Sequence, residues 1–513
     1  MNRQLRRLGV GLLACYLALF AMINYVQVVR ARALNNDPEN TRRIVRDFDQ
    51  ARGDVVTADG VVLACTVDVT DTGGQDPLAG GPLDCTQPAQ RTSQFERQRL
   101  YPERDLFGHV SGHFNFGFGA TGVEREYNDF LAGRTDEQRF RSLSDLFVER
   151  ERTADVTLTL RKDVQEVARS ALAEATEGAG AVVALDPRDG SILALWSNPA
   201  YDPNLLSSNA AGDSQQNKTT LEADPGRPLR GRTWQERFFP GSTFKVVTGS
   251  IGVDGEQVTP ENPSYPVATQ FDPADGRPIQ NFGGSSCGGA LFQVLRVSCN
   301  SAFAEMGAVT IGPESMLAGA EDFGLNDRPP IDLPNAATSV FPDTDSIALT
   351  ALASIGQGDT STSPLQMALA ASAVANNGIV MRPHVMAEIR DAEGDVIEAY
   401  ESRAWKQAIS GTTADTMRAA MYGVVDNGTA TRLDIAGFDV GGKTGTAQLG
   451  TDPPSSHAWI IGFAGPPGEQ PTVAVAVIVE AQPGVSEITG GRVAAPVARQ
   501  VMERILEIQS ATG

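Results

Sequence analysis

The chain has 513 residues, of which 41% are hydrophobic and 20% are charged, and its 42 basic and 63 acidic side chains give a net charge of −21. This length allows two or three domains with ordinary cores, and the composition excludes collagenous and disordered chains. The negative charge argues against a phosphate-binding surface, so nucleic acid is not an expected partner.

The N-terminus has the features of a membrane anchor. Three arginines in residues 1–7 precede a run at residues 8–29 that is apolar without interruption up to Asn24. This length suits a spanning helix better than a signal-peptide core, and the arginines favour a cytoplasmic tail at 1–7. A cleaved signal is the alternative, because residues 31–33 offer a small-x-small site that contains an arginine. We therefore expect a single-pass membrane protein whose remaining residues lie outside the cytoplasm.

Residues 34–153 are rich in Gly, Asp and Arg, and their pattern indicates short strands and turns. A hairpin is predicted at residues 54–63, and the polar, Gly/Pro-rich residues 68–90 indicate a loop. His109 and His113 are four residues apart, but no third ligand is nearby, so we interpret them as structural and expect no metal site.

Cysteine usage agrees with an oxidising location. Cys15 lies in the apolar run, which leaves four cysteines, Cys65, Cys85, Cys287 and Cys299. Four cysteines allow three pairings. We favour Cys65 with Cys85 and Cys287 with Cys299, because each pair lies within one predicted domain and closes a short loop. Reduced thiols are the alternative interpretation.

Longer elements begin near residue 154. A strand is predicted at 156–160, a helix at 162–177, and a hairpin of two strands at 181–185 and 191–195. The polar stretch 201–232 indicates a long loop.

A Pro-Gly turn at residues 240–241 precedes Ser242 and an apolar run, which indicates the start of a helix. Lys245 follows three residues later and would share one face of that helix with Ser242. A serine needs a base to become a nucleophile, and an amine is such a base only if burial or a second cation lowers its pKa. Ser-x-x-Lys alone is a weak signal, because most such pairs are incidental.

Two later motifs strengthen this hypothesis. Ser298-Cys299-Asn300 stands where a loop is expected to enter a helix, and Lys443-Thr444-Gly445-Thr446 precedes a predicted strand at 457–463. The chain has only five lysines and two of them lie in these motifs, where an amine that can lose its proton differs chemically from a guanidinium that cannot. Together the three motifs predict a serine acyl-transfer site.

The remaining pattern is helical after Asn300, with the strongest helix at 363–376, and it returns to strands at 457–463 and 472–480. A helix at 494–508 ends the chain. The predicted fold class is α+β.

Ser-x-x-Lys, Ser-x-Asn and Lys-Thr-Gly, in this order, resemble the three signatures of penicillin-binding proteins and serine β-lactamases. The similarity extends to Arg52-Gly53 and to residues 119–124, 194–199 and 363–366, and so covers most of the chain. A single apolar segment and no room for a glycosyltransferase domain make the chain similar to class B, monofunctional members, and among these to an actinobacterial group. Where the family usually has Asn-Arg before the nucleophile helix, this chain has Gly231-Arg232, which puts any contact by that asparagine in doubt.

The resemblance implies an architecture. Residues 34–153 would form a mainly β or irregular pedestal, similar to a dimerisation domain, that lifts the catalytic domain from the membrane and offers surface to partners. Residues 154–513 would form the transpeptidase domain, with an antiparallel five-stranded sheet flanked by helices and an all-α subdomain. No metal or organic cofactor is implied.

The resemblance also implies roles for the motif residues. Ser242 would attack a D-Ala carbonyl of a peptidoglycan stem peptide, or a β-lactam; Lys245, kept neutral in part by Lys443, would take its proton, and Ser298 would relay the proton to the leaving amine. The backbone N–H groups of Ser242 and Thr446 would stabilise the oxyanion. Thr444 and Thr446 would bind the terminal carboxylate, and Asn300 would hydrogen-bond the backbone of the substrate. Gly445, which lacks a Cβ, would allow the strand and the substrate to approach each other closely.

Several alternatives stay open. A D,D-carboxypeptidase could use the same residues, whereas a β-lactamase is disfavoured by the anchor and the additional domain. A non-catalytic scaffold or penicillin sensor of the cell-wall machinery is the alternative from another class. The family suggests a cell-wall polymerase and division or elongation proteins as partners, and no residue identifies the contact. The sequence also does not identify the acceptor amine, or whether the wall that is made is septal or lateral.

Overall fold

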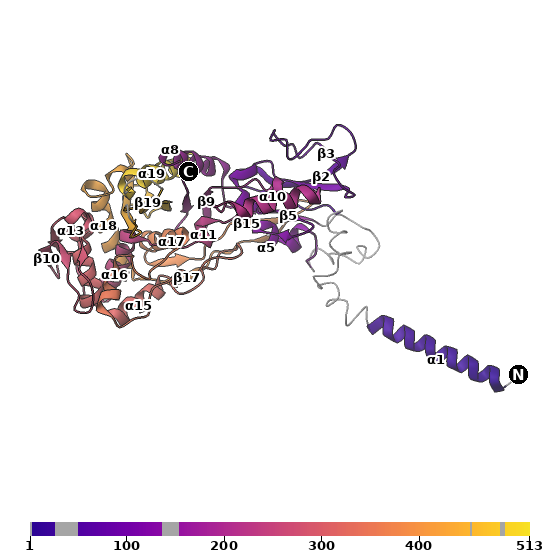
Figure 1. Ribbon diagram of the computed structural model, residues 1–513, viewed down its shortest axis with the longest axis horizontal. Helices are drawn as coiled ribbons and strands as arrows, with labels where there is room; N and C mark the ends of the chain where they lie inside the picture. The colour runs from indigo at the N-terminus through magenta and orange to yellow at the C-terminus, as the bar shows by residue number, and fades with distance from the viewer. Residues whose placement is uncertain (1–2, 26–49, 136–152, 452–453, 483–487, 513) are drawn as a thin grey trace.

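The computed structural model describes residues 3–25, 50–135, 153–451, 454–482 and 488–512. Helix α1 (Arg3–Tyr25) stands apart from the rest of the chain (Figure 1). The apolar side chains described for residues 9–25 of this helix are exposed, and Leu12 and Phe20 keep 66% and 59% of their surface. No helix among the described residues combines the length and the apolar character needed to cross a membrane. Residues 1–2 and 26–29 of the predicted tail and anchor, and 34–49 and 136–152 of the predicted pedestal, lie outside the described residues.

Seven strands in the described part of the chain form one sheet that joins the two predicted domains. They are β1 (Val55–Val56), β2 (Val62–Thr70), β3 (Ala89–Gln90), β4 (Arg97–Leu100), β7 (Ala154–Leu158), β15 (Met386–Asp391) and β16 (Val396–Ala399). Their order is β16-β15-β7-β1-β2-β3, and β4 pairs with β2. Strand β7 runs parallel to β1 and antiparallel to β15. The predicted boundary at residue 154 therefore falls inside a sheet.

A buried ion cluster holds the N-terminal region together. The carboxylate of Glu124 is fully buried, and it accepts hydrogen bonds from Arg52 Nε and Arg99 Nε, both at 2.6 Å. Tyr101 donates its hydroxyl to the same carboxylate at 3.1 Å. Gly53 has no room for a side chain, because a Cβ there would lie 2.0 Å from the carbonyl oxygen of Ala154. These contacts explain why an Arg-Gly pair and a distant glutamate occur together in this region.

Short elements surround this cluster, and Cys65 is joined to Cys85, one of the two pairings that the sequence favours. The elements are η2 (Arg104–Leu106), α4 (Gly108–Ser111), β5 (Phe114–Asn115), β6 (Gly119–Ala120), α5 (Gly122–Glu126) and α6 (Asn128–Leu131). The segment 68–90, predicted as a loop, contributes the end of β2 and the short strand β3 to the sheet.

The second sheet is antiparallel and consists, among the described residues, of five strands in the order β18-β19-β20-β8-β9. These are β8 (Gly180–Leu185), β9 (Ile192–Asn198), β18 (Asp439–Gln448), β19 (Ser456–Gly465) and β20 (Val473–Val479). Helices α8 (Lys162–Ala175) and α19 (Gly490–Thr512) pack together and α19 covers the sheet, while α11 (Arg232–Gln235), α17 (Pro364–Ala375) and α18 (Gly411–Asn427) also contact it. Because helices cover it, every residue of β8 and β20 is buried, which explains their continuous apolar runs.

Local signals explain where the best-predicted helix begins. Ser363 caps α17 by accepting a hydrogen bond from the backbone N–H of Gln366 at 3.1 Å, and Pro364 occupies the first turn. All twelve residues of this helix are buried, because it lies against the five-stranded sheet. The predicted helix at 363–376 therefore differs from the observed one by a single residue at each end.

The remaining elements form a largely helical region beside the second sheet (Figure 1). Its helices are η4 (Gly241–Phe244), α12 (Lys245–Asp254), η5 (Phe282–Gly284), α13 (Leu291–Arg296), α14 (Asn300–Glu305), η6 (Met306–Ile311), α15 (Pro313–Asp322) and α16 (Ile347–Ser354). Its short strands are β10 (Tyr265–Ala268), β11 (Gln270–Phe271), β12 (Ile279–Gln280) and β13 (Cys287–Gly289). Elsewhere lie the pair β14 (Ile379–Met381) and β17 (Ala404–Gln407), and η7 (Thr431–Leu433). The predicted mixed α+β fold is confirmed.

One prediction is wrong. The stretch 201–232, expected to be a long loop, contains α9 (Asn204–Ser207) and the thirteen-residue helix α10 (Ala211–Ala223). Helix α10 is polar on nearly all sides, so it lacks the apolar stripe that identifies a helix. Local contacts stabilise it, including an ion pair between Lys218 and Glu222 one turn apart and a hydrogen bond from Asn217 to the carbonyl of Leu205.

Candidate active site

The Pro-Gly turn and the helix after it position Ser242. Gly241 has a φ of 53°, a conformation that glycine adopts readily, and its N–H donates to the carbonyl of Gly356 at 2.9 Å. The 3₁₀ turn η4 then leads directly into α12, whose first residue is Lys245. Ser242 is partly exposed and Lys245 is fully buried, so the hydroxyl faces the solvent side and the amine the interior.

The Lys245 amine makes three hydrogen bonds with the Ser-x-Asn motif. Its Nζ donates to the carbonyl of Ser298 at 2.7 Å, to Ser298 Oγ at 3.2 Å and to Asn300 Oδ1 at 2.6 Å. Burial, followed by the nearby charge of Lys443, lowers the pKa of Lys245 well below its usual value. A lysine whose pKa is lowered is neutral, and so able to accept a proton, at a lower pH than an ordinary lysine.

Ser298 lies between two amines. Lys443 Nζ donates to Ser298 Oγ at 2.8 Å, so the same hydroxyl contacts both Lys245 and Lys443. Lys443 also donates to the Thr444 carbonyl at 2.8 Å, and burial lowers the pKa of Lys443 to about 7. The hydroxyl of Ser298 therefore provides a short path for a proton between the two lysines.

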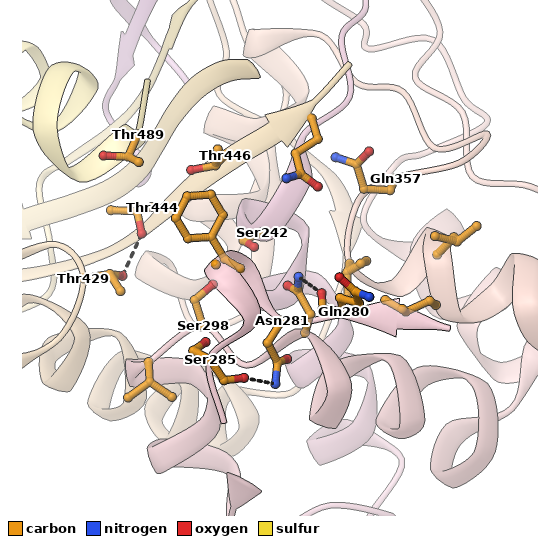
Figure 2. A pocket seen from close by; sticks show the side chains of 18 of the residues that line it. Ser242, Gln280, Asn281, Ser285, Ser298, Gln357, Thr429, Thr444, Thr446 and Thr489 are labelled. Atoms are coloured by element: carbon orange, nitrogen blue, oxygen red, sulfur yellow. Dashed lines mark hydrogen bonds between the residues drawn. The ribbon is translucent and has the colours of Figure 1, made fainter. Parts of the chain in front are cut away.

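Ser298 has a φ of 60°, which a non-glycine residue adopts only when its surroundings hold it there. Two ties hold this turn. A disulfide joins Cys299 to Cys287 of β13, the other pairing that the sequence favours. The buried side chain of Asn281 accepts the N–H of Ser301 at 2.8 Å and donates to the carbonyl of Ser285 at 3.0 Å (Figure 2).

Asn300 contacts protein groups on both sides of its amide. Its Oδ1 accepts from Lys245, and its Nδ2 donates to the carbonyl of Gln280 at 2.9 Å. A side-chain amide has two donor hydrogens, so one remains for another acceptor.

Strand β18 brings the Lys-Thr-Gly motif to the nucleophile. A Cβ on Gly445 would lie 3.0 Å from the carbonyl oxygen of Pro240 and 2.9 Å from Thr243 Cγ2. The missing side chain thus allows the strand to approach the Ser242 turn, and the close approach of substrate to Gly445 stays a prediction. On either side of Gly445, the Thr444 hydroxyl is hydrogen-bonded to Thr429 Oγ1 at 2.7 Å, and Thr446 is partly exposed.

The motifs open into one cleft with a volume of about 1380 Å³. Figure 2 shows Ser242 and Ser298 facing the same space, with Thr429, Thr444 and Thr489 on one side of Ser242 and Gln280 and Gln357 on the other. The predicted residues that line the cleft are Ser242, Ser298, Asn300, Thr444 and Thr446, while Lys245 and Lys443 lie buried beneath it. A nucleophile, two low-pKa amines and a bridging hydroxyl can carry out acyl transfer through a serine ester.

Sequence reasoning missed several residues of this cleft. Thr429 follows an Asn-Gly turn that the sequence does show, but nothing in the pattern indicates its contact with Thr444. Gln280, Asn281, Thr489 and Arg492 carry no signal, because each is brought in by chain packing.

The Gly231-Arg232 pair lies beside the sheet. Arg232 is buried and pairs with Glu480 at 2.7 Å. A Cβ on Gly231 would lie 2.6 Å from the ring of Trp234, so the ring occupies the space of a side chain.

His109 and His113 are buried, and burial lowers the pKa of each to about 4. His109 Nε2 lies 2.7 Å from the carbonyl of Pro228 and His113 Nδ1 lies 3.3 Å from the Tyr201 hydroxyl. Within the described ranges, no three His, Cys, Asp or Glu side chains are grouped so as to hold a metal ion.

Comparison with known proteins identifies the family. Residues 180–503 match the penicillin-binding protein transpeptidase domain, and residues 79–156 match the penicillin-binding protein A dimerisation domain. The peptidoglycan D,D-transpeptidases PbpA of Mycolicibacterium smegmatis and Mycobacterium tuberculosis are 35% and 34% identical, each with 99% of both chains covered.

Solved structures agree with this match. The penicillin G acyl-enzyme complex of penicillin-binding protein A from Mycobacterium tuberculosis has a TM-score of 0.77 at 32% identity, covering 89% of this chain and 99% of that one. Its imipenem acyl-enzyme complex has the same score, identity and coverage. The resemblance to class B members of the actinobacterial type is confirmed, and the chain belongs to the penicillin-binding protein transpeptidase family.

Proposed function

We propose that this chain is a peptidoglycan D,D-transpeptidase that cross-links stem peptides through an ester on Ser242, and that β-lactams inhibit it by acylating the same serine. The observation that carries the proposal is that the Ser298 hydroxyl contacts two buried amines, those of Lys245 and Lys443. Lys245 follows Ser242 by one helical turn. The relatives named peptidoglycan D,D-transpeptidase and the acyl-enzyme complexes of penicillin-binding protein A support it.

Acylation begins with Lys245 in its neutral form. Its amine accepts the Ser242 proton as Oγ attacks the carbonyl of the penultimate D-Ala, and a tetrahedral oxyanion forms. The backbone N–H groups of Ser242 and Thr446 are assigned to that oxyanion, and the close packing of the Gly241 turn on β18 supports this, since a Cβ on Gly241 would lie 2.9 Å from the Thr446 carbonyl oxygen. The C–N bond then breaks, and the proton passes through Ser298 to the leaving D-Ala amine.

The second half reverses these steps with a different amine. An acceptor amine from another stem peptide attacks the ester, the bond to Ser242 Oγ breaks, and the proton of the amine returns to Ser242. Thr444 and Thr446 are assigned to the terminal carboxylate of the substrate, because their side chains are on the cleft side of β18. The remaining donor hydrogen of Asn300 is assigned to the substrate backbone.

The chain is further proposed to be held at the cell membrane by the segment 8–29, with residues 1–7 in the cytoplasm and the catalytic region outside. The exposed apolar side chains of α1 support this, because α1 makes no core with the rest of the described chain. Residues 34–153 would act as a pedestal and residues 154–513 as the transpeptidase domain. A cell-wall polymerase and division or elongation proteins are the proposed partners.

Intact-mass spectrometry of the full-length protein in detergent, mixed with penicillin, tests the proposal. A mass increase of one penicillin that persists for many minutes is expected in the wild type and not in Ser242→Ala. No adduct on folded wild-type protein would refute the acyl-serine chemistry and favour the scaffold interpretation, and an adduct lost within seconds would indicate a β-lactamase. A peptide ending in D-Ala–D-Ala then separates the remaining alternatives, since release of D-Ala without transfer to any amine would indicate a carboxypeptidase.

A further inference from the structure

One end of the cleft is lined by hydroxyl groups. Thr429, Thr444 and Thr489 lie together on one side of Ser242 (Figure 2). The hydroxyls of Thr429 and Thr444 are 2.7 Å apart. This end is therefore polar, and it includes Thr444, one of the two threonines assigned to the terminal carboxylate.

Two arginines complete the same end. Arg492 stands in the first turn of α19, where a Cβ on the preceding Gly491 would lie 3.4 Å from Thr444 Cγ2, so this turn packs on the threonine itself. Arg432 belongs to η7, and its Nη1 donates to the carbonyl of Arg492 at 3.2 Å. Both arginines line the cleft and are exposed to solvent.

The charge of the cleft is opposite to that of the chain. The net charge is −21, yet the ionisable side chains that line the cleft are Arg277, Arg432, Arg492 and Asp275. The carboxylate of Asp275 accepts hydrogen bonds from Ser346 Oγ at 2.7 Å and from the N–H of Ala348 at 2.8 Å. None of the ion pairs within the described residues involves Arg432 or Arg492. Two guanidinium groups that have no carboxylate partner in the described part of the chain favour an anionic ligand at this end.

The direction of acyl transfer indicates which part of the substrate lies at the threonine-lined end of the cleft. The leaving D-Ala carries a carboxylate next to its amine, and its assignment to Thr444 and Thr446 places it on the side of Arg432 and Arg492. Aminolysis of the ester reverses the departure of that amine, so microscopic reversibility brings the acceptor nitrogen in from the same side. The arginines therefore face the acceptor after the D-Ala has left.

We propose that Arg432 and Arg492 select acceptor amines that carry a carboxylate on the carbon next to the amine, as an amino acid or a diamino acid does, over amines without a neighbouring charge. This inference rests on the proposed transpeptidase function and names its acceptor class. In the selected step the acceptor nitrogen bonds to the acyl carbon, the bond to Ser242 Oγ breaks, and the proton of the amine passes to Ser242.

Partitioning of a common acyl-enzyme tests this inference. Full-length protein is acylated by a peptide ending in D-Ala–D-Ala in the presence of D-methionine or D-methioninamide, and the transfer and hydrolysis products are quantified by mass spectrometry. The two acceptors differ only in the carboxylate. Because the ratio is formed after acylation, any effect on donor binding cancels, and comparing variants with the wild type cancels the intrinsic reactivity of each amine.

We expect the double variant Arg432→Gln/Arg492→Gln to lower the preference for D-methionine over D-methioninamide by about five- to tenfold, the size of two exposed charge contacts. Arg277→Gln is the matched control, because it makes the same substitution among the other residues that line the cleft, and it should leave the preference unchanged. Raising the ionic strength should lower the wild-type preference in the same direction, without any substitution.

Three results would overturn the inference. An unchanged preference in the double variant, with slower acylation alone, would assign the arginines to the donor carboxylate. An equal loss in Arg277→Gln would indicate a general potential of the cleft, and a wild-type preference that ignores salt would exclude a charge effect. Failure of the proposed function is distinguishable, because the wild type would then form no penicillin adduct, whereas failure of this inference leaves that adduct intact.

Discussion

Replacing Lys443 with methionine removes a charge from beside Lys245 while keeping a long, buried side chain. In the wild type, both amines contact Ser298 Oγ, at 3.2 and 2.8 Å, so they are no more than about 6 Å apart. A unit charge at that distance is worth ~3 kcal/mol at an effective dielectric constant of about 20, or about two units in the pKa of Lys245. Burial continues to lower the pKa of Lys245 in the variant, so we expect a rise of about two units that does not restore the usual value.

The sign of the effect follows from the role of Lys245 as a base. Acylation needs neutral Lys245, so raising its pKa moves the acidic limb of the rate profile to higher pH, by up to about two units. The pKa of Lys443 is about 7, so in the wild type its charge is present below that pH and fades above it. The wild-type rate should therefore exceed the rate of Lys443→Met most strongly below about pH 7, by up to about a hundredfold.

Stopped-flow measurement of acylation by a fluorescent penicillin, between about pH 5 and about pH 9, checks this prediction. Lys406→Met is the matched control, because Lys406 pairs with Asp327 at the surface and its removal should leave the profile unchanged. An acidic limb that stays in place in Lys443→Met would refute the reasoning, because burial alone would then set the pKa of Lys245. A constant rate difference at every pH would point instead to the lost hydrogen bond with Ser298.

Three further substitutions test the surroundings of the nucleophile. Ser298→Ala should slow acylation by about a hundredfold or more, because it removes the hydroxyl between the two amines, and a rate within a few fold of wild type would exclude a proton relay there. Gly356→Ala should cost at least ~2 kcal/mol in denaturant unfolding, because the φ is 72° and the new Cβ would lie 2.2 Å from the Gly241 carbonyl oxygen; unchanged stability would contradict this packing. Cys287→Ser/Cys299→Ser should lower the free energy of unfolding by about 3 kcal/mol and slow acylation; reducing agent, which also opens Cys65–Cys85, should slow acylation in the wild type but not in the variant.

Much of the fold could be predicted because its elements bury clear apolar patterns. Strands β8 and β20 are buried along their whole length, and α17 has a capping serine and a proline at its start. Helix α10 could not be predicted, because it buries almost nothing and depends on local polar contacts. The long-range pairing of β7 with β1 and β15 also leaves no trace in the sequence, since register between distant strands is set by packing.

The candidate site divides in the same way. Ser242, Lys245, Ser298 and Lys443 could be predicted, because their chemistry requires particular residue types at short, fixed spacings. Their surroundings could not. Arg492 lines the cleft next to Gly491, where a Cβ would lie 2.4 Å from the Thr429 carbonyl oxygen, a close approach between distant parts of the chain that no local pattern encodes.

The central place of β7 affects how the protein is synthesised and folded. A fragment that begins at residue 154 would carry β7 with the backbone groups facing β1 unpaired, an open edge that other chains could extend into aggregates. The nascent chain meets the same difficulty, because the sheet contains strands from Val55 to Ala399 and cannot close until most of the chain has been translated. Strands β1 and β2 are therefore synthesised long before β15 and β16 of the same sheet. We expect the N-terminal region and the region after residue 154 to fold and unfold as one cooperative unit.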